Sequence, residues 1–284
     1  MHRRFRKLPS MVVNYVKVVA GRKPYLAPEG HPLGHVVFEA TDVKPTVGHV
    51  RRYREVCRVP DSEYLPHAFP HVLAMPLHMY IFTAPSFPVK VLGLIHLRNI
   101  IRCLRPIRIG AVLRITAEWE TLRETPVGQE YDLITRAYVE GELAWEEVST
   151  MLAHRATPGQ RPKIERGGDA EVKQPFEVAA NTGRRYALVS GDFNPIHLSA
   201  KTASWFGFKQ GVAHGMWSMS RALGQGAALL PTGPIQIDTQ FKLPLYLPSV
   251  VTFRGQSHSD GSRADFSLGS DRDRLHLAMQ VFRL

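Results

Sequence analysis

The sequence predicts an α+β fold in which one unit occurs twice, with a helix lying on a curved antiparallel sheet in each copy. One observation behind this is that two separate parts of the chain carry strand-like runs divided by turn signals. Another is that residues 104–115 align with residues 242–253 without a gap, so that Pro106 meets Pro244. A short segment that ends in histidine also precedes an apolar run in both parts, at 69–71 and 212–214. These matches keep the same order along the chain and indicate an internal duplication, in which helix and sheet bury one face of each other.

Residues 1–34 are basic and rich in proline and glycine, which predicts an N-terminal extension with one short helix or strand. The positive charges gather at its start, at Arg3, Arg4, Arg6 and Lys7. Like charges repel one another and stay hydrated, so we interpret this cluster as a solvated arm.

Residues 35–155 form the first predicted repeat. A strand is expected at 36–40, followed by a short, interrupted helix within 65–80, because Pro76 falls inside that apolar stretch and proline damages a helix interior. Four longer strands follow, separated by turns that contain proline or glycine, at 94–103, 111–123, 129–140 and 142–154. Consecutive strands joined by short turns predict an antiparallel meander.

Residues 156–174 are polar and contain few apolar side chains, which is typical of a linker. The second predicted repeat covers residues 175–284. It opens with a loop-and-helix region over about 182–230 and continues with strands at 235–243, 249–256, 264–268 and 275–282.

The charge balance favours an anionic partner. The chain has 36 Lys and Arg against 25 Asp and Glu, which gives a formal net charge of +11. A nucleic acid and a phosphorylated carrier or substrate are both candidates, but no motif of alternating aromatic and basic residues supports nucleic-acid binding.

The two cysteines, Cys57 and Cys103, are too few for a disulfide framework or a cysteine-rich zinc site and fit a reducing compartment. The sequence contains no apolar run of membrane-spanning length and no secretory signal, so we expect a cytoplasmic protein without a membrane partner. The histidines at 67, 71 and 78 do not predict a metal site, because prolines disturb their helical register and no carboxylate or cysteine completes the set.

One short segment of the second repeat carries chemistry. It runs from Ser190 through Gly191 to His197, and Gly191 permits the positive φ of a tight turn. The Asn194–Pro195 pair also favours a turn. The resulting loop presents Asp192, Asn194 and His197 within six residues. A carboxylate and an imidazole on one turn can share a water molecule and transfer its proton. The alternative is a capped turn in which Asp192 and Asn194 only satisfy backbone groups.

Gly215 lies where the apolar run after His214 begins, in the first turn of a predicted helix. Backbone N–H groups there lack helical partners and stand at the positive end of the helix dipole. A glycine N–H at that point can approach a carbonyl oxygen closely and stabilise developing negative charge. The alternative is close packing of the helix, and His214 is interpreted as a structural hydrogen-bonding residue.

These residues resemble the signature of the MaoC-like acyl dehydratases, or R-specific enoyl-CoA hydratases (hydratase 2), a family with the hotdog fold. The resemblance rests on Tyr186, 190–192, 194–197 and 213–216. It is specific over residues 182–225 and only architectural over 35–155, where the catalytic motif is lacking. The chain is therefore similar to double-hotdog members of the family, with one active site per chain.

The resemblance implies reversible hydration of a trans-2-enoyl thioester to an (R)-3-hydroxyacyl thioester. Asp192 and His197 would hold the water between them, with His197 as base and Asp192 as the acid for the α-carbon, although so coupled a pair permits no firm assignment. Asn194 would position the pair, and the Gly215 N–H would polarise the thioester carbonyl. No metal or redox cofactor is required. The acyl chain would enter a tunnel between the central helix and the sheet.

Substrate-binding roles are expected for Ser190, Gly191 and His214 in the same motifs. Arg184 and Lys209, on either side of the motif, are candidates for contacts with a CoA phosphate or an acidic acyl-carrier surface, and the alternative is that both are solvated charges. The expected partner is an acyl-CoA or acyl-carrier-protein thioester, and a homodimer is left open.

Two other functions are open. A thioesterase can have the same fold, but hotdog thioesterases place their acid or base on the helix rather than in this loop. A non-catalytic protein that binds or scaffolds acyl thioesters is the other alternative. The sequence leaves acyl chain length, carrier preference and physiological direction undecided.

Overall fold

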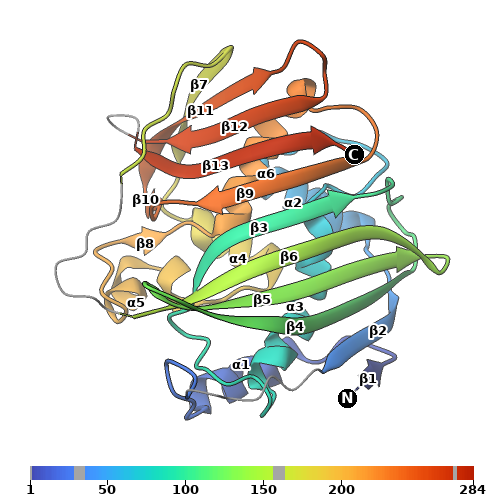
Figure 1. Cartoon of the computed structure of the whole chain (residues 1–284), viewed down its shortest axis with the longest axis vertical. Helices are drawn as coiled ribbons and strands as arrows, with labels where there is room; N and C mark the ends of the chain where they lie inside the picture. The colour runs from blue at the N-terminus through green and yellow to red at the C-terminus, as the bar shows by residue number, and fades with distance from the viewer. Residues whose placement is uncertain (1, 29–35, 156–163, 271–273) are drawn as a thin grey trace.

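The computed structural model describes residues 2–28, 36–155, 164–270 and 274–284. One 11-stranded sheet, in the order β1-β2-β4-β5-β6-β3-β9-β13-β12-β11-β7, runs through the whole molecule. The long helices lie on one face of this curved sheet (Figure 1). The predicted α+β class is confirmed.

The first repeat contributes five neighbouring strands and two helices. They are β2 (Val37–Val43), α2 (Val47–Cys57), α3 (Phe69–Thr83), β3 (Ile95–Cys103), β4 (Leu113–Thr125), β5 (Gly128–Val139) and β6 (Glu142–His154). All contacts among β4, β5, β6 and β3 are antiparallel, as the meander predicts.

The second repeat uses the same order of elements. They are β7 (Val172–Val178), α4 (Thr182–Ser190), α6 (Gly215–Gln225), β9 (Ile235–Phe241), β11 (Ser249–Ser257), β12 (Arg263–Gly269) and β13 (Leu275–Arg283). The two halves of the sheet meet where β3 pairs antiparallel with β9, with Asn99 opposite Thr239. The strands of the second half follow one another in the reverse order to those of the first, so that β3 corresponds to β9 and β2 to β7.

Shorter elements fill the connection between α4 and α6 and the segment after α6. They are η1 (Pro195–His197), α5 (Ala200–Ser204), β8 (Gly211–Val212), η2 (Ala227–Leu229) and β10 (Tyr246–Leu247). Strand β8 pairs with β10, which holds the segment before α6 in place.

Helix α3 differs from the short, interrupted helix expected at 65–80, because it continues to Thr83 through Pro76. Pro70 lies in the first turn, where a missing N–H costs nothing. Pro76 removes one internal hydrogen bond. Phe69, Leu77 and Ile81 are completely buried along the helix. The free energy of this burial outweighs the tendency of Pro76 to interrupt the helix.

The hydrophobic core is continuous across both repeats. Tyr53 and Phe69 of the first repeat belong to the same cluster of buried side chains as Tyr186 and Phe253 of the second. Tyr53 and Tyr186 are ring neighbours, with centroids 6.2 Å apart. The repeats therefore share one interior rather than forming two separate domains.

The N-terminal extension is folded onto the first repeat rather than forming a free arm, but Arg3, Arg4, Arg6 and Lys7 are exposed, as their interpretation as solvated charges expects. Strand β1 (His2–Phe5) pairs parallel with β2, and Arg4 Nε donates to Glu39 Oε1 at 2.7 Å. Helix α1 (Met11–Ala20) packs against α3 at the lower end of Figure 1. The sequence predicted one short helix or strand here, and the structure contains both.

Strand β7 begins at Val172, inside the segment 156–174 that was predicted as a linker, and pairs with β11. Residues 156–163 of that segment lie outside the described residues. The part before β7 contacts the second repeat, since Glu165 accepts a hydrogen bond from the Leu275 N–H.

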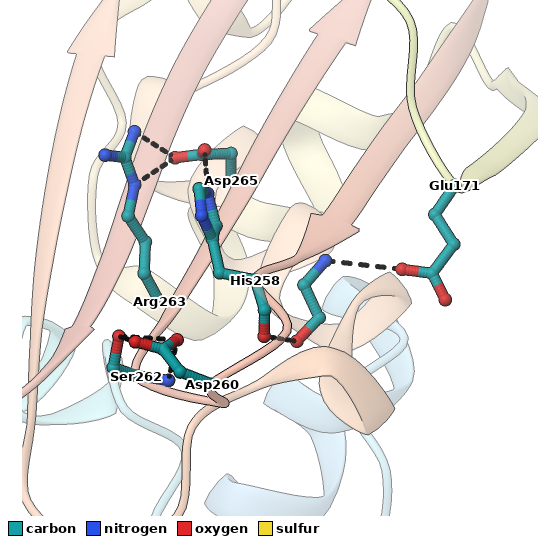
Figure 2. Close-up of polar contacts among 7 residues, drawn as sticks. Glu171, His258, Asp260, Ser262, Arg263 and Asp265 are labelled. Carbon is teal, nitrogen blue, oxygen red and sulfur yellow. Dashed lines mark hydrogen bonds and ion pairs between the residues drawn. The ribbon is translucent and has the colours of Figure 1, made fainter.

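The hairpin between β11 and β12 is held by side-chain contacts (Figure 2). Asp265 accepts from both His258 and Arg263, and Asp260 accepts from Ser262. Glu171, just before β7, accepts from the backbone of Ser257.

The described helices include none that is long and apolar enough to cross a bilayer.

Candidate active site

Two glycines shape the end of α4. Gly191 caps the helix in the left-handed region at φ 77°, as its place in the motif predicted, and its N–H donates to Ala187 O. At Gly183, a Cβ atom would stand 1.9 Å from the carbonyl oxygen of His197. The helix can therefore lie directly against the loop that carries His197.

The turn after α4 is held by its own polar side chains. Ser190 Oγ accepts from the Asp192 N–H at 3.1 Å, and Asp192 Oδ1 accepts from the Asn194 N–H at 3.0 Å. Asn194 Oδ1 accepts from the Ile196 N–H at 3.4 Å. The contacts of Asp192 and Asn194 are thus those of the capped-turn alternative. The Asn194 side chain stabilises the turn from which Asp192 and His197 project.

The two histidines of the site each contact a backbone carbonyl. His197 Nδ1 lies 2.7 Å from Val212 O, and His214 Nε2 lies 2.9 Å from Asp192 O. A carbonyl only accepts, so these nitrogens carry the protons. His197 Nε2 is then the unprotonated nitrogen of a neutral ring. The two rings stack with centroids 3.7 Å apart.

The surroundings favour a charged carboxylate beside neutral imidazoles. Burial raises the pKa of Asp192, but His214, His197, the Asn194 N–H and the Tyr15 hydroxyl together bring that pKa below its ordinary value. Burial lowers the pKa of His197, and Asp192 offsets only part of this effect. Burial also lowers the pKa of His214 to about 3. At neutral pH the site therefore contains a carboxylate and a histidine that can accept a proton.

Ligand atoms of Asp192, His197 and His214 lie within 4.8 Å of one another, a spacing that could hold a metal ion. However, His197 Nδ1 and His214 Nε2 are already occupied by backbone carbonyls. His214 Nδ1 is buried and has no hydrogen-bond partner among the described residues. The absence of a metal stays a prediction.

These groups open into a cavity of about 470 Å³ between α3, α6 and the sheet. Ser190, Asp192, Asn194, His197, His214 and Gly215 all line it. Gly215 is the first residue of α6, as predicted, and a Cβ atom there would stand 3.0 Å from the Phe241 ring. The lack of a side chain keeps the unpaired N–H groups of this helix start close to the cavity.

Three of the predicted substrate-binding residues lie outside the cavity lining. Arg184 and Lys209 are exposed, and neither is among the described residues that line the cavity. Arg184 Nη1 instead donates to Leu198 O at 3.0 Å. Gly191 is not on the lining either, and a Cβ atom there would meet Met11 of α1. A role for the two cations in holding a charged carrier stays a prediction.

Tyr15 is a site residue that the sequence did not reveal. Its hydroxyl donates to Asp192 Oδ1 at 3.3 Å and accepts from the Phe193 N–H at 2.5 Å. Burial, and then the Asp192 charge, raise the pKa of Tyr15 far above its ordinary value, so the hydroxyl keeps its proton. Helix α1 thus ties the N-terminal extension to the carboxylate. No motif signals this contact, because it depends on how α1 packs.

The first repeat also contributes polar side chains to the cavity, including His71, His78 and His96. The sequence offered no carboxylate to accompany His67, His71 and His78, and the structure supplies one for His71, because Glu147 Oε2 of β6 lies 2.8 Å from His71 Nδ1. Asn99 Nδ2 donates to Glu147 Oε1 at 2.7 Å. Burial lowers the pKa of His71, but Glu147 outweighs this effect and raises it.

The sequence is similar to a known protein family and to a protein of known activity. Residues 162–261 match the family model described as "MaoC like domain". The chain is 29% identical over 252 residues to 3-hydroxyacyl-thioester dehydratase X of Mycobacterium tuberculosis, covering 86% of this chain and 88% of that protein.

Solved structures are similar over most of the chain. The crystal structure of HtdX from Mycobacterium tuberculosis matches with a TM-score of 0.77 and 28% identity, covering 87% of this chain and 99% of that one. Another structure from the same organism, described as a double hotdog fold, matches with a TM-score of 0.55 and 12% identity, over 87% of this chain and 96% of that one. The second likeness concerns the fold alone.

Proposed function

We propose, from the premise that residues 162–261 are a MaoC-like domain within a double hotdog, that this chain reversibly hydrates trans-2-enoyl thioesters to (R)-3-hydroxyacyl thioesters. The observation that carries the proposal is the placement of Asp192 and His197 Nε2 at one cavity wall, beside the start of α6. The similarity to 3-hydroxyacyl-thioester dehydratase X supports this class of reaction, because an enzyme that adds or removes water in this way is a hydro-lyase.

In the hydration direction, Asp192 and His197 hold a water molecule between them. The hydroxyl oxygen bonds to C3 of the enoyl group, and the electron pair of the double bond moves through C2 onto the thioester oxygen. The Gly215 N–H donates to that oxygen and stabilises its negative charge. C2 then takes a proton, the carbonyl re-forms, and the elements of one water have been added.

The protonation states restrict how the proton moves. Asp192 is charged and His197 is neutral before the reaction, so neither brings a proton of its own. The proton that leaves the water must therefore be the one that reaches C2, by way of the pair. His197 Nε2 is the acceptor, and Asp192 delivers the proton after the pair has shared it. Dehydration follows the same path in reverse.

The test is an assay of crotonyl-CoA hydration, followed by the loss of enoyl absorbance. Asp192→Asn and His197→Ala should each reduce kcat/KM by roughly 10²- to 10⁴-fold while the circular dichroism spectrum stays unchanged. Lys44→Ala, which removes an exposed charge outside the cavity lining and outside the predicted site, is the control and should keep its activity.

Other outcomes would decide against the proposal. Full activity in both variants would remove Asp192 and His197 from the mechanism. Release of free CoA thiol without hydration would indicate a thioesterase. Tight binding of the thioester with no turnover of either kind would indicate a non-catalytic acyl-thioester protein.

A further inference from the structure

The molecule contains a second cavity of about 500 Å³, at the place that corresponds to the catalytic cavity in the other repeat. The catalytic cavity lies between the end of α4, the start of α6, residues 241–245 and the body of α3. The second one lies between the end of α2, the start of α3, residues 103–107 and the body of α6. The internal duplication therefore supplies two cavities, and we call the second one the Arg54 cavity.

The Arg54 cavity has lost the acid and base. Arg58 caps α2 in the left-handed conformation, as Gly191 caps α4. The residues that follow are Val59, Pro60 and Asp61, where the second repeat has the catalytic loop. Asp61 is exposed, and among the described residues it makes no hydrogen bond to His67, a histidine of the same cavity, which points to binding rather than catalysis.

A buried cation distinguishes this cavity. Arg54 is only 6% exposed, and its Nη2 donates to the carbonyl oxygens of Ser62 and Tyr64. Its Nη1 has no hydrogen-bond partner among the described residues, and the same holds for Nε of Arg105, another lining residue. Leaving a buried guanidinium nitrogen unpaired is costly, and a nearby anion would offset part of this cost.

The position of α3 adds to the positive potential. The helix starts at Phe69 with no side-chain cap from Ala68 and no acidic residue in its first turn, so no side chain of this segment offsets the positive end of the dipole. Ala68 and Pro70 both line the cavity. Among the described lining residues, Asp61 is the one carboxylate, and it lies on the exposed side.

The remaining wall is apolar. Its side chains come from both repeats and include Leu65, Ile107, Trp145, Leu223 and Leu230. A cavity of this size falls within the range of roughly 300–1,000 Å³ that holds small organic ligands. An apolar wall next to a buried guanidinium with one nitrogen lacking a hydrogen-bond partner suits a ligand with a single negative charge on an aliphatic chain.

We propose that the Arg54 cavity binds an aliphatic monocarboxylate, with the carboxylate on the Arg54 guanidinium and the chain against the apolar wall. This assignment is independent of the reaction at the catalytic cavity, because it uses neither Asp192 nor His197.

The test is calorimetric titration of the full chain with octanoate. We expect one saturable site whose affinity falls about tenfold or more in Arg54→Gln, because a charge-assisted hydrogen bond is lost. Asp61→Asn should tighten binding, since a competing negative charge is removed. Octanamide, which has the same chain without the charge, should not compete. Arg51→Gln, an exposed position on the same helix, is the matched control and should bind octanoate as the unmodified chain does.

A second readout locates the ligand. Met75 and Met79 line the catalytic cavity, whereas no methionine is among the described residues of the Arg54 cavity. Octanoate should therefore leave the methyl resonances of these two methionines unshifted. Ala227→Leu, which narrows the Arg54 cavity without touching Arg54, should weaken binding even if Arg54→Gln folds poorly.

The proposal is overturned by the absence of saturable octanoate binding. It is equally overturned if binding shifts the Met75 and Met79 methyls and is indifferent to Ala227→Leu, because the ligand would then occupy the catalytic cavity.

Discussion

The contact between His197 Nδ1 and Val212 O is the residue-scale detail that matters most for the proposed reaction. This contact keeps a proton on Nδ1 of His197 and leaves Nε2 free to accept another proton. Burial adds to this by lowering the pKa of the ring, so that the neutral form persists into mildly acidic solution.

The pH dependence of kcat/KM follows from this shift. A base must be unprotonated to act, so activity falls as the pH drops through the pKa of His197, which lies below the ordinary histidine value of about 6.5. We expect the acidic limb of the profile to lie below that value. A limb centred above it would contradict His197 as the base.

Tyr15→Phe tests whether the N-terminal extension acts on the site through Asp192. Loss of the hydroxyl removes one donor to the carboxylate, which should raise the pKa of Asp192 and lower kcat by roughly tenfold with little change in KM. Tyr138→Phe, a hydroxyl deletion outside the cavity lining, is the control. A lower melting temperature with an unchanged pH profile would mean that Tyr15 only supports the fold.

The sequence predicted what local signals determine at the site. Gly191, Asn194 and Gly215 carry their own conformational information, so the positive φ at Gly191, the turn at Asn194 and the helix start at Gly215 were predicted correctly. Tyr15 and Glu147 were missed, since Tyr15 contacts Asp192 and Glu147 contacts His71 from a distant element. Such contacts depend on packing, which no spacing along the chain encodes.

At the scale of elements, the four consecutive long strands of each repeat were predicted well because alternation and turn residues are local signals, whereas β7 was not predicted. The end of β6 at His154 and the start of β9 at Ile235 agree with the sequence. Helix α3 was predicted too short, because burial on all sides compensates for Pro76. The pairing of the extension with the first repeat was not predicted for a related reason, since Arg4 contacts Glu39 only once β1 lies beside β2.

The His71–Glu147 pair joins α3 to β6 and gives an element-scale prediction. Both side chains are buried, so Glu147→Gln leaves His71 without its counter-charge and should lower the free energy of unfolding by about 3–5 kcal/mol, measured by urea denaturation. The double variant His71→Gln with Glu147→Gln should be less destabilised. An unchanged urea midpoint in the single variant would show that the pair contributes nothing to stability.

The sign of the pH effect differs for the two partners. The pKa of His71 is raised on folding, so its contribution is full below the unfolded pKa and is lost as the pH rises through the folded pKa. Burial raises the pKa of Glu147, but His71 and Asn99 bring it below the ordinary value, so its contribution is lost at acidic pH. The stabilisation from the pair should therefore be greatest between these two limits.

At the scale of the whole molecule, the β3–β9 pairing and the continuous core make the two repeats depend on each other. We expect a single unfolding transition with equal calorimetric and van't Hoff enthalpies. Differential scanning calorimetry can check this, and two resolved transitions would indicate that each repeat is stable alone. The duplication itself was readable from the aligned prolines Pro106 and Pro244, whereas the joint interior was not.

The fusion of both repeats into one polypeptide has an evolutionary consequence. In a symmetric pair of identical chains, every mutation appears at both equivalent positions. A change that suits one pocket therefore also alters the equivalent pocket of the other chain. Here the loop after α2 and the loop after α4 are encoded by different codons, and selection can act on each alone. One half was thereby free to abandon chemistry while the other retained it.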